Sequence, residues 1–107
     1  ERVAEDRGGQ RDEVAEEKRQ DLMYRIVIKK SAARELESLP SRILSSVTKA
    51  ILNLSFQPRP AGCKKLKGQS GYLWRIRIGD YRVIYSIDDV VKIIDVQKVG
   101  HRKDIYD

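Results

Sequence analysis

The chain has 107 residues, with 22 Lys and Arg against 16 Asp and Glu for a net charge of +6, and it has one cysteine and one histidine. This length corresponds to one domain, and a single cysteine excludes an internal disulfide framework and the usual multi-cysteine zinc sites, so we expect a reducing cytoplasm and neither a metal nor a cofactor. No apolar run approaches the roughly 18 residues of a membrane span, and no signal-peptide pattern occurs, so we expect no membrane partner.

The charge changes sign along the chain. Residues 1–22 contain five basic and eight acidic residues, a net charge of −3, and no aromatic residue, so they cannot build a core of their own. The remaining residues, 23–107, carry +9. We therefore expect residues 1–22 to be an acidic extension, a vector-derived remnant or an upstream reading-frame segment, and residues 23–107 to be the functional domain. The alternative is that residues 10–22, which have helix-forming composition, cap the domain as a helix.

The first half of the domain is predicted to hold one strand and two helices. Residues 24–29 are short and β-branched, which predicts a strand. Ser31 is expected to cap a helix over residues 32–39 that Pro40 ends, and Ser41 to cap a second helix. Apolar residues of this second helix recur three and four positions apart, at Ile43, Leu44, Val47, Ala50, Ile51 and Leu54.

The second half of the domain is predicted to be mainly extended. A basic loop over residues 64–68 precedes three strand-like runs at 72–78, 81–87 and 90–99. The element order β-α-α-β-β-β predicts an α+β domain in which a helical hairpin packs on a mainly antiparallel, twisted sheet.

A tight hairpin is predicted at Gly79-Asp80, because two alternating runs flank this two-residue turn. Pairing Ile78 with Tyr81 then determines which side chains share a face of the sheet. The apolar face is expected in the core and consists of Tyr72, Trp74, Ile76, Ile78, Tyr81, Val83, Tyr85 and Ile87.

The opposite face of this hairpin gathers Arg75, Arg77 and Arg82, with Arg77 directly across from Arg82. Like charges across a strand pair destabilise a sheet. Folding therefore gives no reason for the cluster, and an anion ligand explains it. The alternative is a solvated face that Asp95 on the neighbouring strand partly neutralises.

The segment after the last strand adds further candidates. Arg102 would extend the basic patch, and Tyr106 could stack on a base. His101 is the side chain whose ordinary titration range suits proton transfer near neutrality, although a plain surface position is its alternative. The lysines of the basic loop would join the same surface: Lys64, Lys65 and Lys67. Together these residues predict a single-stranded nucleic acid as the partner.

Residues 23–107 resemble the RelE/ParE superfamily of toxins from toxin–antitoxin pairs, and more closely its RelE branch. The resemblance rests on the motifs KKLKG (64–68), YLWRIRIGDYRVIYSI (72–87) and VGHRKDIY (99–106), in this order and spacing. It implies the RelE-like microbial ribonuclease fold and a metal-free endoribonuclease, an mRNA interferase, that cuts messenger RNA in the ribosomal A site. It also implies arrest by a cognate antitoxin and contact with operator DNA only through the antitoxin complex.

The resemblance also implies roles for individual residues. Arg75 and Arg77 match the two basic residues on the family's second strand, and Arg82 matches the arginine of its GYR segment. Arg102 matches the arginine after the VG-x motif, and Tyr106 matches the C-terminal tyrosine, with a shorter spacing than in well-known members.

The reaction implied is attack of the ribose 2′-OH on the adjacent phosphate, which leaves a 2′,3′-cyclic phosphate and a 5′-OH. We expect Arg82 and Arg77 to hold the phosphate, and Arg102 to stabilise or protonate the leaving oxygen. Well-known members carry lysines at the second-strand positions, whereas arginine effectively cannot exchange a proton. Proton transfer is then expected from His101 or Tyr106, or the protein relies on electrostatics and ribosomal positioning.

Two alternatives belong to other functional classes. The ParE branch shares the fold but inhibits DNA gyrase by binding. A catalytically degenerate toxin would act as a binding module and co-repressor within its antitoxin complex.

Overall fold

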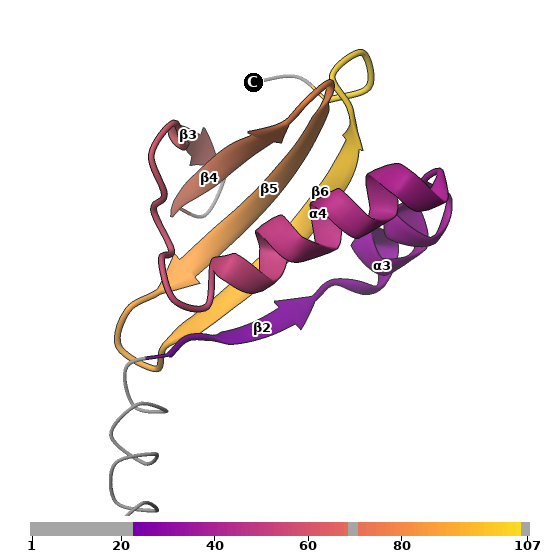
Figure 1. Cartoon of the computed structure of the whole chain (residues 1–107). Coiled ribbons are helices and arrows are strands. Elements are labelled where there is room, and N and C mark those ends of the chain that lie inside the picture. The colour runs from indigo at the N-terminus through magenta and orange to yellow at the C-terminus, as the bar shows by residue number, and fades with distance from the viewer. Residues whose placement is uncertain (1–22, 69–70, 106–107) are drawn as a thin grey trace, which may run out of the picture.

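The computed structural model describes residues 23–68 and 71–105 (Figure 1). The predictions for residues 1–22 and for Tyr106 therefore lie outside the described residues. The elements are, in chain order, β2 (Arg25–Ile28), α3 (Lys30–Glu37), α4 (Ser41–Asn53), β3 (Lys64–Gly68), β4 (Gly71–Ile78), β5 (Tyr81–Asp88) and β6 (Ile93–His101). Within the described ranges, no helix is both long enough and apolar enough to cross a membrane.

The strands form one five-stranded sheet in the order β2-β6-β5-β4-β3. β2 runs parallel to β6, and the other three neighbouring pairs are antiparallel. In Figure 1, α4 crosses the sheet, and α3 follows the C-terminal end of β2. The predicted α+β class, with a helical hairpin on a mainly antiparallel sheet, is confirmed.

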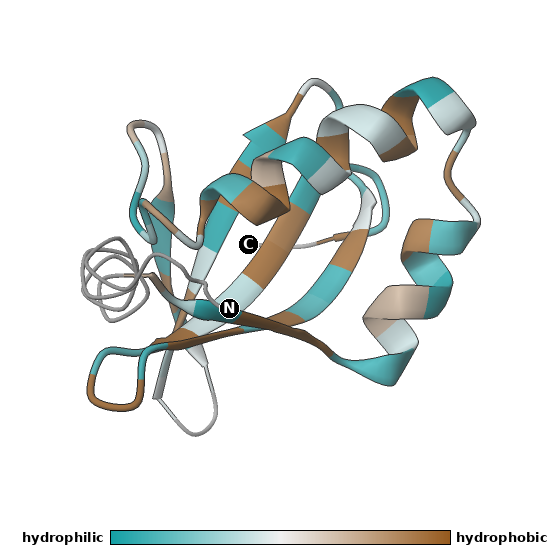
Figure 2. Ribbon diagram, turned by 60° about the horizontal axis from the view of Figure 1, so that its bottom comes forward, coloured by the Kyte–Doolittle hydropathy of each residue, from teal (hydrophilic) through white to brown (hydrophobic). Residues whose placement is uncertain are grey.

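The two helices cover one face of the sheet. Figure 2 shows hydrophobic and hydrophilic residues alternating along the central strands beneath α4. Val47 and Ile51 of α4 are buried against Val83 and Tyr85 of β5, as the helical spacing predicts. The Tyr85 hydroxyl donates a 2.6 Å hydrogen bond to the carbonyl of Pro58, and burial raises the pKa of this hydroxyl. Tyr85 therefore ties the loop after α4 to the sheet.

The predicted basic loop is wrong, because Lys64–Gly68 forms the edge strand β3. This strand pairs with β4 from Lys64 opposite Arg75 to Gly68 opposite Gly71. A lysine-rich segment carries little strand propensity of its own, and pairing with β4 stabilises it as a strand. Lysine at a sheet edge also discourages pairing with a further chain.

Other boundaries also differ from the prediction. Strand β6 begins at Ile93, because Val90 and Val91 donate their backbone N–H groups to the Asp88 carboxylate in a turn. Ser31 and Ser41 do not cap the helices. α3 begins two residues earlier than predicted and α4 one residue earlier, and the carbonyls of Lys29 and Pro40 accept the first helical hydrogen bonds. Tyr72 is 59% exposed rather than in the core, since it lies near the end of β4.

Candidate nucleic-acid interface

The hairpin of β4 and β5 has the predicted register. Ile78 pairs with Tyr81 across the turn, and Arg77 lies directly opposite Arg82. Gly79 adopts a φ of +59° in this turn, a conformation that favours glycine. The turn therefore sets the alternation that separates the apolar side chains from the arginines.

Cationic residues of β3, β4 and β5 gather on the sheet face opposite the helices. We call this surface the arginine face, and it consists of Lys64, Arg75, Arg77 and Arg82. Arg75 is only 8% exposed, whereas Arg77 is exposed. Among the described residues both helices pack on the other face of the sheet, so a ligand can reach the exposed Arg77 side chain.

Arg82 lies at the centre of the positive charge. Partial desolvation lowers the pKa of its guanidinium, and the charges of Arg77, Arg75 and Arg102 lower the same pKa further. Its Nη1 donates to the carbonyls of Gly79 at 3.4 Å and Tyr81 at 3.3 Å, which orients the side chain at the turn. An anion placed here would relieve the mutual repulsion of the guanidiniums.

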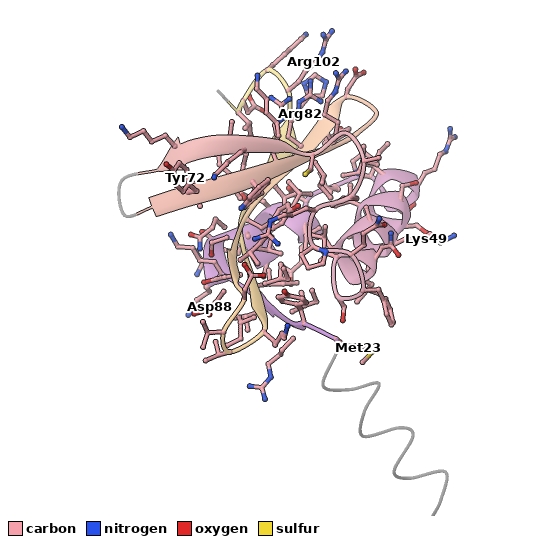
Figure 3. All side chains as sticks on the ribbon, turned by 90° about the vertical axis from the view of Figure 1, so that its left-hand side faces the viewer. Met23, Lys49, Tyr72, Arg82, Asp88 and Arg102 are labelled. Atoms are coloured by element: carbon pink, nitrogen blue, oxygen red, sulfur yellow. The ribbon has the colours of Figure 1, made fainter. Side chains whose placement is uncertain are left out.

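Arg102 is brought to the same end of the sheet by the β4–β5 turn. Its backbone N–H donates to the carbonyl of Asp80 at 2.7 Å, and its Nε lies 3.6 Å from the Asp80 carboxylate. Figure 3 shows Arg82 and Arg102 at one end of the sheet and Asp88 at the other. The structure thus brings Arg75, Arg77, Arg82 and Arg102 together.

His101 does not join this cluster. It pairs with Tyr81, whereas Arg82 pairs with Gly100, and successive strand residues point to opposite faces. His101 therefore lies on the helix side, where its ring contacts Tyr81 edge to face at 5.3 Å. Its Nδ1 accepts the backbone N–H of Lys103 at 3.1 Å.

A β-bulge explains the position of His101. The register between β5 and β6 shifts between Ile84 and Tyr85, which leaves Gln97 as the additional residue of β6. Without this bulge, strict alternation from Val96 would place His101 on the arginine face. The bulge instead keeps Val99 in the core and turns Lys98, which sequence reasoning missed, toward the arginine face. The signal is the polar pair between Val96 and Val99, which interrupts the alternation.

The three lysines of β3 divide between the two faces. Lys64 joins the arginine face, opposite Arg75. Lys65 and Lys67 pair with Trp74 and Tyr72, and the Lys65 Nζ lies 3.9 Å from the centre of the Tyr72 ring. Only Lys64 is therefore placed to share a ligand with the arginines by this geometry.

A second charged cluster supports the opposite end of the sheet, and sequence reasoning missed it. Arg59 forms a 2.8 Å ion pair with Asp89 and lies 4.9 Å from the centre of the Trp74 ring. The Tyr24 hydroxyl donates to the same carboxylate at 2.6 Å. These bonds to Arg59 and Tyr24 lower the pKa of Asp89 to about 2. Tyr24 and Arg59 of this cluster lie 65 and 30 residues from Asp89 in the sequence, so no local sequence pattern indicates the cluster.

The arginine face can bind and stabilise negatively charged groups through its positive charges. Guanidiniums pair with phosphate oxygens in a bidentate manner and keep their charge at any physiological pH. Arg77 and Arg82 sit opposite each other on adjacent strands, so a single phosphate can contact both. Among residues 23–68 and 71–105, no three His, Cys, Asp or Glu side chains gather as metal ligands.

Comparison with known proteins gives consistent matches. Residues 26–106 match the family model described as ParE toxin of the type II toxin–antitoxin system parDE. The toxin RelG of Mycobacterium tuberculosis is 37% identical over 79% of this chain and 98% of that protein. The toxin RelE of the same organism is 32% identical over 80% of this chain and 89% of that protein.

Solved structures agree with these matches. The archaeal RelE–RelB complex from Pyrococcus horikoshii contains a chain similar to this one, with a TM-score of 0.68 and 33% identity over 78% of this chain and 99% of that chain. The RelBE2 toxin–antitoxin complex from Mycobacterium tuberculosis gives a TM-score of 0.67 and 32% identity over 78% of this chain and 95% of that chain.

Proposed function

The chain belongs to the RelE/ParE family of toxins from type II toxin–antitoxin systems, and from this membership we propose that it is a ribosome-dependent endoribonuclease. It cuts messenger RNA in the A site of the ribosome, in the cytoplasm, and so inhibits translation. The observation that supports this proposal is the gathering of Arg75, Arg77, Arg82 and Arg102 at one end of the sheet.

The reaction we propose is an in-line transfer within the RNA. The 2′ oxygen bonds to the adjacent phosphorus, the bond from phosphorus to the 5′ oxygen breaks, and a 2′,3′-cyclic phosphate and a 5′-OH result. Negative charge grows on the phosphate oxygens as the phosphorane forms. Arg77 and Arg82 are placed to hold those oxygens, and Arg102 to stabilise the leaving oxygen, so that fixed positive charge stabilises the transition state.

Proton transfer follows a different route in this proposal. Arginines stay protonated and cannot act as base or acid. His101 faces the helix side of the sheet, away from the arginine face. Tyr106, which lies outside the described residues, is the remaining side chain that the sequence offers for proton transfer. Where it takes no part, the 2′-OH loses its proton to water, the leaving oxygen takes one from water, and the ribosome supplies the alignment that isolated RNA lacks.

The partner side of the proposal is a cognate antitoxin, because the similar solved toxins are held in complexes with RelB-type proteins. A positive body attracts an acidic partner at long range and speeds its association. Operator DNA is met only through that complex.

The test is in vitro translation of a defined message, with 5′ ends mapped by primer extension. Wild-type protein should cut within codons only when ribosomes are present, and Arg82→Ala should abolish the cuts. Arg42→Ala is the matched control, because Arg42 is an exposed arginine on α4, on the other side of the sheet. An intact message with the wild-type protein would refute the proposal.

A gyrase inhibitor is the second candidate, and two observations favour it. The matching family model is named for ParE. In addition, the arginine face holds no imidazole among the described residues. A supercoiling assay with purified gyrase separates the two candidates, since only a ParE-like protein would block it while leaving messages intact.

A further inference from the structure

A cavity of about 390 Å³ lies between the end of α4, the loop at residues 60–62 and β4. This volume falls within the range of small-ligand pockets, roughly 300–1,000 Å³. Its walls include Asn53 from α4, Pro60 from the loop, and Ile76 and Arg77 from β4. The cavity thus combines apolar walls with one carboxamide and one guanidinium.

The cavity adjoins the arginine face through Arg77, which belongs to both. β3 covers the outer edge of β4 only from Gly71 to Arg75, because its pairing begins with Lys64 opposite Arg75. The edge beyond Arg75 is therefore uncovered by another strand of the described chain. A nucleotide whose phosphate contacts the Arg77 guanidinium can pass this edge and place its base in the cavity.

The lining fits a nucleobase better than it fits a phosphate or a peptide. Single-stranded RNA is recognised by unstacked bases that lie against apolar side chains and arginine and hydrogen-bond through their edges. Pro60 and Ile76 offer apolar contact, and Arg77 adds a cation to the lining. The Asn53 carboxamide both donates and accepts, which is the pattern that pairs with the edge of adenine.

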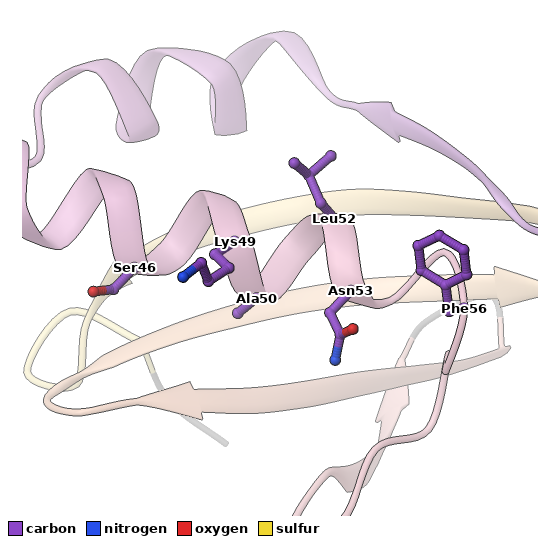
Figure 4. Close-up of a pocket in the computed structure, with 6 residues that line it drawn as sticks. All are labelled: Ser46, Lys49, Ala50, Leu52, Asn53 and Phe56. Carbon is purple, nitrogen blue, oxygen red and sulfur yellow. The ribbon is translucent and has the colours of Figure 1, made fainter.

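Hydrogen bonds hold the backbone of Asn53. It is the last residue of α4, and its carbonyl accepts the N–H groups of Phe56 and Gln57, both at 3.1 Å. Figure 4 shows Asn53 and Ala50 pointing from α4 toward the strands, away from Leu52. Its side chain is exposed, so a ligand can reach it.

The neighbouring hollow in Figure 4 has a different character. It shares Ala50 and Asn53 with the cavity but opens between Leu52, which is 58% exposed, and Phe56, which is 66% exposed. Lys49 is its only cation, and none of the arginines lines it. It therefore offers no continuous path for a phosphate backbone.

We propose that the cavity receives the base next to the phosphate held by Arg77 and Arg82, and that Asn53 selects adenine there. The inference rests on the proposed function and adds to it the residue that determines which sites are cut.

The experiment uses the same ribosomal translation, with a message that presents all four bases at every codon position, and sequences the 5′ ends in bulk. Wild-type protein should show one position, fixed relative to the cut, at which adenine is enriched about tenfold, as a bidentate pair predicts. Asn53→Ala should reduce that enrichment to within about twofold of the message composition. Asn53→Asp, which replaces the donor by an acceptor, should shift the preference toward cytosine, whose exocyclic amine donates.

Gln57→Ala is the matched control. Gln57 is an exposed amide four residues later that does not line the cavity, so its removal should leave the base distribution unchanged. Thermal melts of all variants establish that the fold is retained.

The outcomes separate the two proposals. If wild-type protein cuts and Arg82→Ala does not, but Asn53→Ala keeps the wild-type base distribution, the base site is refuted and the nuclease stands. If Asn53→Ala instead loses only antitoxin affinity, the cavity belongs to a protein partner and the base site is again refuted. If wild-type protein does not cut, the nuclease proposal fails and the base site fails with it.

Discussion

The direct pairing of Arg77 with Arg82 lowers the stability of the sheet. The stability gained when one of these charges is removed therefore measures the cost of placing both arginines in the site. Like charges opposite each other across antiparallel strands are destabilising, and salt screens them. We expect Arg77→Gln to raise the free energy of unfolding by up to about 1 kcal/mol at low salt, and to weaken cleavage. The gain should shrink as salt is added. Urea unfolding at two salt concentrations measures it.

The control for this prediction is Arg42→Gln, which removes the same charge from an exposed position on α4. It should change the stability little and in a manner nearly independent of salt. Equal salt dependence of the two variants would show that the pairing of Arg77 and Arg82 carries no strain.

Asp89 gives the sheet a dependence on pH. Its hydrogen bonds to Arg59 and Tyr24 lower its pKa from an ordinary 3.8 to about 2, so the folded state favours the charged carboxylate. The stabilisation is therefore fully present above pH 4 and is lost as the pH falls toward 2. Asp89→Asn should flatten the melting temperature over this range, measured by circular dichroism. Asp104→Asn, at an exposed aspartate near the other end of the sheet, should keep the wild-type slope.

At the scale of elements, the turn at Gly79 holds the two arginine-bearing strands in register. A side chain at this position would meet no atom within 4 Å, so the cost of Gly79→Ala is the left-handed φ of +59° and not crowding. We expect a loss of about 1 kcal/mol in the free energy of unfolding. Cleavage should fall further than stability, because the strain acts between Arg77 and Arg82. Denaturant unfolding and translation assays measure the two effects.

Gly100→Ala is the comparison for this turn. Gly100 lies opposite Arg82, and a side chain there would contact Ile105 at 3.4 Å, an ordinary packing distance, with no positive φ. It should therefore cost less stability than Gly79→Ala. If the two variants lose stability equally, backbone strain at the turn is not the cause.

Elements with a clear local sequence pattern could be predicted, whereas elements that form only through pairing with a neighbouring strand could not. Period-two alternation and a two-residue turn determine the register of β4 and β5, so the meeting of Arg75, Arg77 and Arg82 followed from sequence alone. β3 has lysines in place of β-branched residues, and its pairing depends on β4. The start of β6 was misplaced because Val90 and Val91 are apolar residues in an exposed turn.

The face that a residue near a strand end occupies depends on how the strand pairs with its neighbours over its whole length. One bulged residue, Gln97, reverses the alternation of β6 and sends His101 to the helix side while Lys98 joins the arginines. The sequence predicts a strand that ends at residue 99 with His101 in the segment after it, whereas β6 extends to His101 and its alternation determines the face. Arg102, beyond the strand, reached the cluster through hydrogen bonding to Asp80, which no periodicity encodes.

We propose that residue 22 separates an acidic extension from the toxin domain. The family match begins at residue 26. Just before β2, the backbone N–H of Tyr24 donates to the carbonyl of Ser55, and the Tyr24 carbonyl accepts the Ser55 hydroxyl at 2.7 Å, so the start of the sheet is held by contacts within residues 23–107. Protein beginning at Met23 should keep the wild-type melting temperature and the same cut sites. Because its net charge rises from +6 to +9, it should associate with ribosomes faster at low salt, an advantage that disappears near 0.5 M salt, where the Debye length is about 4 Å. Stopped-flow binding across a salt series, beside the translation assay, measures both. Loss of cutting or of the melting transition in the shortened protein would show that residues 1–22 are part of the functional domain.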